Sequence, residues 1–437
     1  MMRLKTSSTY EQKKLRILYD ITLVVLIIVS DIGEVNIPKI IFIGASAVFM
    51  GCATAVDIVY MLAFTFPFLC GIPGTYIMLI ALVCYVFKRR KVKSSLVLFF
   101  LFALILEFVN AILYDSLDMI LIVQYMVYLF LLFSLIYDTD LSLNYKKLLQ
   151  ISVLGLLIVA GIIAAKSIIY APTDWLYRLS RGWYRFGDDF AEDRSGMMLR
   201  LNANNMAYFC ITGMSSTLLL FLSGNKREKF YNVIFSAAFF VIGLFSMSRS
   251  FIVVAVLVVI LFILSSVKNP HKVFSVMIIV SLVIFSALYL LSNNPELLAG
   301  FFKRFTNADM QTGGGRTSLI MKTIETWSSR ILTILIGSGI SGYYGVFTSK
   351  IHCGLLQILY VYGVIGAPIL LYFLLKPVIL ALKKEKIGII YYMPWIAVVI
   401  FTQTIQFLDP PFLMFNYLVG IYAIRMGINV RGRNDAK

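Results

Sequence analysis

The sequence predicts an all-α fold, a polytopic bundle of transmembrane helices that forms one integral-membrane domain over residues 1–437. Hydrophobic residues make up 60% of the chain and charged residues only 14%, and the mean hydropathy is +0.88. Apolar runs of about 20 residues recur, and each is long enough to cross roughly 30 Å of hydrocarbon. A soluble domain leaves too much of its surface in water to hide so many apolar side chains.

The formal net charge of +17 comes mainly from short basic segments between the apolar runs. Lysine and arginine in such segments mark the cytoplasmic side of a membrane protein, so we expect both termini in the cytoplasm and no binding of nucleic acid. The five cysteines have no metal-ligand spacing, and we expect no disulfide framework, metal or other cofactor. The basic segments lie at 5–16, 88–93, 146–147, 225–229, 268–272 and 383–386, and in the tail after residue 425.

Ten spans are predicted from residue 94 onward, and they alternate between the two faces of the membrane. The first third of the chain adds spans at 17–31 and 37–55, whereas 57–87 contains FPFLCGIPG, whose prolines and glycines predict a broken, re-entrant or hairpin pair. An even number of crossings must separate two cytoplasmic segments, so the total is 12 or 14. The ten spans are 94–114, 118–137, 148–168, 204–223, 230–247, 249–267, 272–292, 353–375, 388–407 and 411–427.

Two long segments remain outside the membrane, 169–203 and 293–352, and we expect short helices in both. The first interleaves Trp175 and Trp183 with arginines. One interpretation is an interfacial aromatic belt whose arginines reach toward the headgroups. The other is a surface that stacks sugar rings on aromatic faces and pairs phosphate with guanidinium groups, and the excess of arginine over lysine favours it. The arginines assigned to substrate binding are Arg181, Arg185, Arg194 and Arg200.

The second external segment places Arg316 directly after three glycines. Glycines let backbone amides approach an anion closely, and a helix starting near Thr317 directs its positive end to the same place. Apolar residues at helical spacing up to Trp327 predict that this helix lies on the membrane surface. A glycine-rich turn is also an ordinary structural element, so the motif alone does not decide between the two roles.

Arg249 and His352 are the other candidates for chemistry. Arg249 lies in SMSRS at an external corner, and it is either the anchor of a helix end or an anion ligand. His352, at the outer mouth of a span, is either an ordinary hydrogen-bonding residue or the side chain that takes a proton from a sugar hydroxyl. Two arginines and one histidine suit a metal-independent displacement of a diphosphate leaving group. Inside the span that starts at residue 94, Glu107 and Asn110 indicate either a structural pairing or a role near the site.

Together these motifs resemble the O-antigen polymerase and O-antigen ligase superfamily. The resemblance rests on SMSRS before a span, on the external GR pair with Trp327 eleven residues later, and on GSG (337–339) with His352 opening the next span. A Gly-x-x-Gly near the middle of that span, at Gly363 and Gly366, belongs to the same pattern. NANN is similar to the Asn-x-Asn of the family and contributes Asn202 and Asn204. The similarity covers residues 94–427 as topology.

The resemblance implies an inverting, metal-independent, GT-C-like glycosyltransferase of the bacterial cytoplasmic membrane. It would join polysaccharide repeat units of the O-antigen or capsule type, carried on undecaprenyl diphosphate, at the outer face. On family precedent Arg249 and Arg316 grip the diphosphate and His352 acts on the acceptor. The expected partners are the undecaprenyl-diphosphate-linked oligosaccharide, membrane lipids, a chain-length regulator and a flippase. The implied substrate-binding residues are the four loop arginines, Asn202, Asn204, Trp327 and Gly339.

Three rival functions stay open. A ligase uses the same donor with a terminal acceptor, but ligases commonly carry Asn after the histidine, where Cys353 stands here. A flippase or another transporter of lipid-linked oligosaccharides predicts charged residues in several spans and paired broken helices, whereas these spans are nearly free of charge. A non-enzymatic scaffold leaves the aromatic and arginine-rich external segments unexplained.

Overall fold

The computed structural model describes most of the chain, and its elements are all helical. The described residues are 10–89, 93–115, 118–171, 173–181, 184–187, 199–266, 285, 289, 292–293, 295, 316–346, 351–384 and 387–434. Within these ranges every secondary-structure element is an α-helix or a 3-10 helix, and no strand occurs among them. The predicted all-α fold class is therefore confirmed.

The helices occur in the following order along the chain. The first half of the chain forms α1 (Tyr10–Asp31), α2 (Lys39–Cys52), α3 (Ala55–Thr65), η1 (Phe66–Cys70), α4 (Gly74–Arg89), α5 (Ser94–Leu113), α6 (Met119–Tyr137), α7 (Tyr145–Ile169) and α8 (Trp175–Arg181). The second half forms α9 (Ala203–Ser223), α10 (Lys226–Phe245), α11 (Arg249–Ser266), α14 (Arg316–Ser328), α15 (Ile331–Ile336), α16 (Gly339–Val346), α17 (Gly354–Lys384), η3 (Ile389–Tyr391), α18 (Met393–Thr402), η4 (Pro411–Met414) and α19 (Phe415–Asn434).

Eight helical segments in the described part of the chain are long and apolar enough to cross a membrane. They are α5, α6, α7, α9, α10, α11, α17 and the segment 411–431 that joins η4 to α19. Shorter apolar helices are α2, α18 and α3 with η1. The protein is thus a multi-pass membrane protein, while the count of 12 or 14 spans stays a prediction. Most of the expected span 272–292 lies outside the described residues.

The break predicted around FPFLCGIPG is present, and it takes the form of a change from α-helix to 3-10 helix. α3 passes directly into the short 3-10 helix η1, which ends at Cys70, and α4 begins at Gly74. Pro67 lies at the start of η1, and a proline that follows an α-helical segment kinks or breaks it because the residue lacks the backbone N–H. Two helices therefore replace a single straight span over 55–89.

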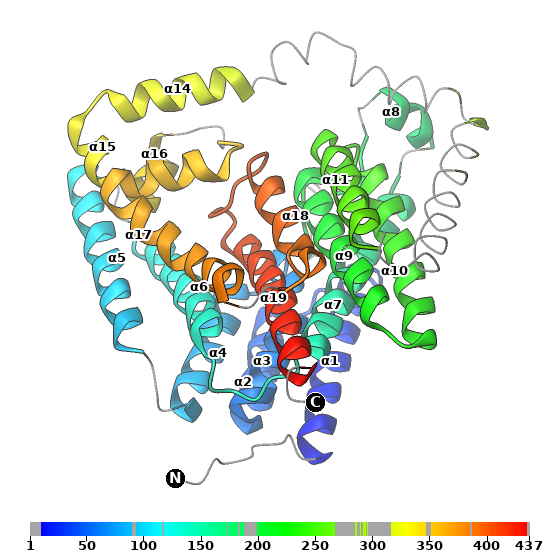
Figure 1. Ribbon diagram of the computed structural model, residues 1–437. Helices are drawn as coiled ribbons and strands as arrows, with labels where there is room; N and C mark the ends of the chain where they lie inside the picture. Colours follow the sequence, from blue (N-terminus) through cyan, green and yellow to red (C-terminus); the bar gives the residue numbers. More distant parts are fainter. Residues whose placement is uncertain are drawn as a thin grey trace.

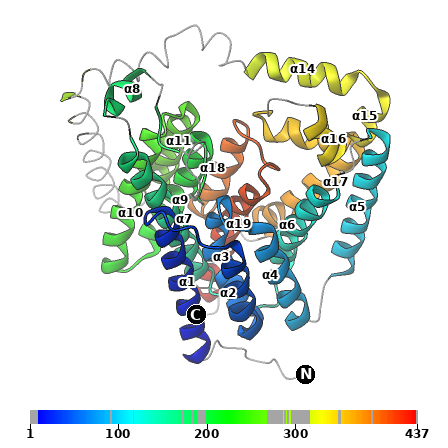
Figure 2. The same ribbon diagram turned by 180° about the vertical axis from the view of Figure 1, so that it is seen from behind.

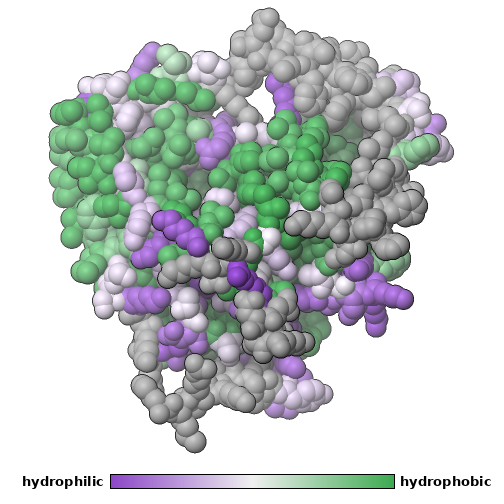
Figure 3. All heavy atoms as spheres, in the orientation of Figure 1, coloured by the Kyte–Doolittle hydropathy of each residue, from purple (hydrophilic) through white to green (hydrophobic). Residues whose placement is uncertain are grey.

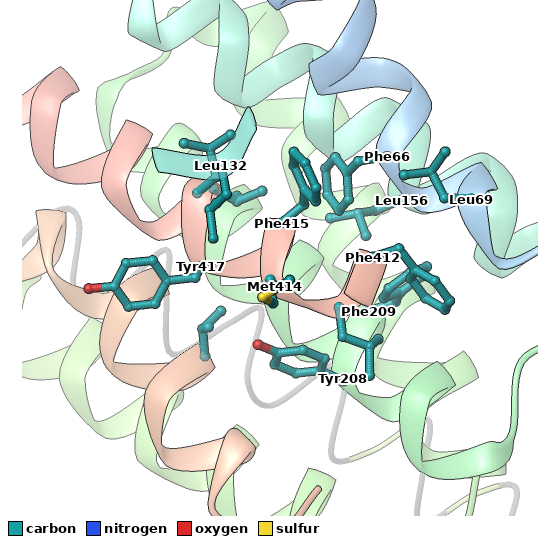
Figure 4. Packing of buried hydrophobic residues seen from close by; sticks show 14 of the residues in the cluster. Phe66, Leu69, Leu132, Leu156, Tyr208, Phe209, Phe412, Met414, Phe415 and Tyr417 are labelled. Atoms are coloured by element: carbon teal, nitrogen blue, oxygen red, sulfur yellow. The ribbon is translucent and has the colours of Figure 1, made fainter. Parts of the chain in front are cut away.

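α9 lies at the centre of the bundle and packs against α7, α10, α11, α18 and α19. A side chain at Gly213 of α9 would overlap the ring of Phe239 in α10, so glycine permits this close helix–helix contact. Figure 4 shows how residues far apart in sequence meet in the core, where η1 contacts η4 and the Phe209 ring of α9 contacts the rings of Phe66 and Phe412. Rings stack there between Phe66 and Phe415, at 6.2 Å between centroids. Such ring pairs add packing energy beyond the burial of their apolar area.

Helices at the edge of the bundle present apolar side chains outward. α5 exposes Val97, Leu98, Leu101, Ile105 and Ile112 along its length. Figure 3 shows this side covered by hydrophobic residues, while hydrophilic residues gather at the lower end, where α10 begins. An apolar face this large is stable only against another apolar medium, which the hydrocarbon of a membrane supplies.

One end of the bundle is basic and joined by ion pairs, and we call it the basic end. The start of α1, the end of α4, the start of α7 and the end of α19 all lie there (Figure 1). Burial raises the pKa of Asp138, but hydrogen bonds from Arg89 and Tyr85 outweigh it and hold that pKa below its ordinary value. The pairs that join helices at this end are Arg16 with Asp57 (3.7 Å), Arg89 with Asp138 (2.5 Å) and Lys146 with Glu228 (2.8 Å).

We predict that the basic end faces the cytoplasm, because short basic loops are retained there. A thiol reagent that cannot cross membranes should then label Ser180→Cys, in α8, on intact cells, and should leave Ser94→Cys, at the start of α5, unlabelled. Both variants are made in a chain without its five native cysteines. Labelling of Ser94→Cys instead would reverse the orientation and put the candidate site in the cytoplasm.

Candidate functional site

The end opposite the basic end carries the short helices of the two long connecting segments. α8 belongs to the segment 169–203, and α14, α15 and α16 belong to 293–352. In Figure 1 and Figure 2 these helices lie across one end of the bundle, and α14 runs nearly at right angles to the long helices. We call this end the loop end. Short helices are thus present in both predicted external segments.

The three predicted catalytic residues all lie at or just before helix starts at the loop end. Arg249 is the first residue of α11 and is half-buried, and Arg316 is the first residue of α14. His352 is half-buried and precedes the first residue of α17 by two positions. α18 packs against α11 and, through Thr402, against the start of α17. Only the main chain of Arg316 is described, and the meeting of the three side chains in one pocket stays a prediction.

The first long segment is fastened to the bundle by a buried ion pair. Lys166, in the last turn of α7, lies 3.5 Å from Asp31 at the end of α1. The Lys166 ammonium donates a hydrogen bond to the Leu199 carbonyl (2.9 Å), and the Leu199 amide donates to the Asp31 carboxylate (3.1 Å). The amide of Phe186 donates to the carbonyl of Phe245 at the end of α10 (3.0 Å). A buried pair is tolerated when further hydrogen bonds satisfy both charges, as happens here.

The substrate-binding residues predicted in this segment lie at the loop end in different settings. Arg185 is half-buried and Arg200 is exposed. The Asn202 side chain caps α9 by accepting a hydrogen bond from the Asn205 amide (2.8 Å), and Asn204 is half-buried in the first helical turn. Capping satisfies a backbone donor that the helix leaves open, which gives Asn202 a structural role as well.

The other two arginines of this prediction are Arg181 and Arg194. Arg181 is the last residue of α8, and Arg194 lies outside the described residues. Their role in binding substrate stays a prediction.

The Gly-Ser-Gly at 337–339 inserts its backbone against a kink in α17. Gly337 has φ +81° and Gly363, at the kink, has φ +62°. A side chain at Gly337 would overlap the Val361 carbonyl, and one at Gly363 would lie 2.5 Å from the Gly337 nitrogen. The Ser338 amide donates to the Tyr360 carbonyl (2.9 Å). Left-handed backbone and close approach both require glycine, so these motif residues position α16 against α17.

Glu107 and Asn110 of α5 make hydrogen bonds to backbone groups at the two ends of this Gly-Ser-Gly segment. The Glu107 carboxylate accepts a hydrogen bond from the Ile340 amide in the first turn of α16 (2.8 Å). The Asn110 side-chain amide donates to the Ile336 carbonyl at the end of α15 (3.1 Å). Of the two interpretations from sequence, the structural pairing is therefore realised, because a carboxylate is favoured at a helix N-terminus.

Gly339 and Trp327 are both packed against neighbouring residues. Gly339 is buried, and a side chain there would lie 2.8 Å from the Glu107 carboxylate. Trp327 is half-buried against the core, and its indole nitrogen has no hydrogen-bond partner among the described residues. Both residues have a packing role, and their role in binding substrate stays a prediction.

His352 lies where the start of α17 meets the loop after α18, and we call residues 351–357 with 402–409 the junction. A side chain at Gly354 would lie 2.8 Å from the Thr402 carbonyl, so the two segments touch. The Cys353 thiol donates to the Gln403 side-chain oxygen (3.9 Å). The Gln357 side-chain oxygen accepts from the amides of Phe407 (3.0 Å) and Leu408 (2.9 Å).

The polar residues of the junction were not predicted from the sequence. The expected span 388–407 is wrong at its end, because α18 stops at Thr402 and 403–410 forms a loop. Pro410 and Pro411 prevent helix through this region, and Gln357 supplies hydrogen bonds that an extended α18 would provide internally. The signal in the sequence is TQTIQFLDPP, in which polar residues interrupt an apolar run just before two prolines.

The loop end combines groups suited to an anion with groups suited to proton transfer. Arg249 and Arg316 begin helices of 18 and 13 residues, whose N-terminal amides favour negative charge. A histidine titrates near neutral pH and can accept a proton from a hydroxyl. Among the described residues no group of three or more His, Cys, Asp or Glu side chains is placed to hold a metal ion.

Comparison of this chain with protein-family models, with curated proteins and with solved structures finds no match.

Proposed function

We propose that this protein is an inverting, metal-independent glycosyltransferase of the bacterial cytoplasmic membrane. It polymerises polysaccharide repeat units that are linked to undecaprenyl diphosphate, at the outer face of the membrane. The observation that supports this most is the position of Arg249, Arg316 and His352. All three stand at or just before the start of helices at the loop end, away from the ion-paired basic end.

The proposed reaction uses the two arginines on the diphosphate and the histidine on the attacking hydroxyl. The acceptor oxygen forms a bond to the anomeric carbon of the donor sugar while the bond from that carbon to the diphosphate oxygen breaks. His352 takes the hydroxyl proton, and the guanidinium groups with the helix N-termini stabilise the charge that develops on the leaving undecaprenyl diphosphate. Back-side attack inverts the configuration at the anomeric carbon.

A ligase that transfers the finished polymer to a terminal acceptor is the second candidate, since the same donor and the same three residues serve it. A flippase or another transporter for lipid-linked oligosaccharides is the third. Transport is disfavoured because Glu107, the carboxylate of α5, caps the start of α16. Transporters place intramembrane charges along a substrate path instead.

Deletion of the gene in its host separates the three candidates. A polymerase mutant should show single repeat units in place of a ladder of chain lengths on a gel of the cell-surface polysaccharide. A ligase mutant should accumulate full ladders on undecaprenyl diphosphate. A flippase mutant should keep single repeat units inaccessible to a glycosidase added outside the cell. An unchanged ladder at the cell surface would refute the polymerase.

A further inference from the structure

A second polar surface lies beside His352, and its chemistry differs from that of the arginines. It belongs to the junction and to Tyr344 of α16. Besides His352, its polar members are amides, hydroxyls, a thiol, an aromatic ring and one carboxylate, and it contains no arginine or lysine within 351–357 and 402–409. Such a set suits a ligand that is rich in hydroxyl groups and carries no charge.

The junction is held in place by hydrogen bonds between distant parts of the chain. The Gln357 side-chain oxygen accepts hydrogen bonds from two backbone amides that lie 50 and 51 residues further along the sequence. The Tyr343 hydroxyl accepts a hydrogen bond from the Ile351 amide (3.1 Å), which fixes the main chain next to His352. A binding site built from the junction is preorganised, because its side chains belong to segments that these hydrogen bonds hold together.

Two glutamines of the loop after α18 provide amide groups at different depths. Gln403 is exposed, and its amide is oriented by a hydrogen bond to the Val399 carbonyl (3.2 Å). Gln406 is only 6% exposed, and its amide nitrogen has no hydrogen-bond partner among the described residues. Native proteins rarely leave a buried donor in this state, so a water molecule or a ligand oxygen is expected to accept from it.

Tyr344 adds an aromatic face next to a carboxylate. Its side chain is 38% exposed although it packs edge-on against Tyr343, with 5.7 Å between ring centroids. The Tyr344 hydroxyl hydrogen-bonds the buried Asp409 carboxylate. A partly exposed aromatic ring beside carboxylate and amide groups is a combination that binds a sugar ring, since the ring stacks while its hydroxyls donate and accept at the edge.

We infer that the junction, with Tyr344, is the subsite for the acceptor saccharide, and that it takes an uncharged, hydroxyl-rich sugar ring. This inference rests on the proposed function and names the part of the substrate that this side of the site recognises. The diphosphate binds separately, at Arg249 and Arg316. His352 lies in the junction itself, next to the expected position of the attacking hydroxyl.

Binding of a saccharide without diphosphate tests the inference directly. The probe is the repeat-unit saccharide released from the host's own surface polysaccharide by glycosidase or mild acid, and the full-length protein is held in lipid nanodiscs. Calorimetry should give dissociation constants for Gln403→Ala, Gln406→Leu and Tyr344→Ala that are about tenfold or more above that of the wild type. Gln150→Leu, which removes a hydrogen bond to Glu228 at the basic end, should bind as the wild type does.

Arg249→Ala separates the two halves of the site, and it should bind the free saccharide with unchanged affinity. Weak binding in this variant together with normal binding in the glutamine variants would place the sugar at the arginines and overturn the inference. No binding by the wild type would overturn it as well, and would leave water as the partner of the buried Gln406 amide. Gln403 and Tyr344 are exposed, so their variants decide the matter even where Gln406→Leu fails to fold.

The outcome of these binding experiments can be distinguished from a failure of the proposed function. An unchanged polysaccharide ladder after gene deletion would refute the polymerase and would leave measured saccharide binding intact. Normal saccharide binding in the three junction variants, with a ladder lost on deletion, would overturn only the subsite.

Discussion

His352→Ala should lower the rate of polymerisation by about 10²–10⁴, because that is the contribution of a positioned general base to a proton transfer. Without the imidazole, the attacking hydroxyl must give its proton to water. The measurement is the ladder of chain lengths in a deletion strain that expresses the variant, together with turnover of lipid-linked repeat units by the purified protein. The abundance of the variant in the membrane must equal that of the wild type.

The other histidine of the chain provides the matched control. His271 is predicted to lie in a cytoplasmic loop, and His271→Ala should leave the ladder unchanged. His352→Gln keeps a hydrogen-bonding side chain of similar length but cannot accept a proton near neutral pH. If His352→Gln retains full activity, His352 only orients the acceptor and does not act as the base.

Replacement of the arginines should have an effect of similar size. Arg316→Ala should abolish chain growth, since it removes a charge-assisted hydrogen bond to the leaving group. Arg249→Lys should lower the rate by about tenfold or more although the charge is kept, because lysine lacks the forked donor geometry that binds two phosphate oxygens. The same ladder and turnover assays measure both variants.

Arg330 is a suitable control because it is exposed at the same end, just before α15. Its guanidinium lies over the Tyr114 ring at 5.9 Å. Arg330→Ala should keep the wild-type ladder. Full activity of Arg249→Lys would show that Arg249 anchors the start of α11 and makes no forked contact with the diphosphate.

Local patterns in the sequence were enough to predict several helices nearly to the residue. The expected spans 94–114, 118–137 and 204–223 correspond to α5, α6 and α9. Hydrophobic length and the breaks made by proline, glycine and charge depend on neighbouring residues only, so a single sequence contains them. The break at FPFLCGIPG was visible for the same reason.

The role of the glycine motif could not be read from its own residues. Position 337 requires glycine because a side chain there would overlap the Val361 carbonyl. Gly339 lies against Glu107, on a helix more than 200 residues earlier in the chain. A glycine-rich turn predicts close approach of something to the backbone. Whether that partner is a substrate or a neighbouring helix depends on packing, and here the described contacts are with α5 and α17.

The sequence by itself determined that this protein is a helical membrane protein with basic segments gathered toward one side, because hydropathy and charge act over one helix length. Tertiary structure alone decided what surrounds His352. The hydrogen bonds from Phe407 and Leu408 to Gln357, and the burial of Gln406 and Asp409 beside them, join segments about 50 residues apart. Long-range pairing of polar groups in an apolar interior is selected by the whole fold, since each buried donor must find its acceptor wherever the chain brings one.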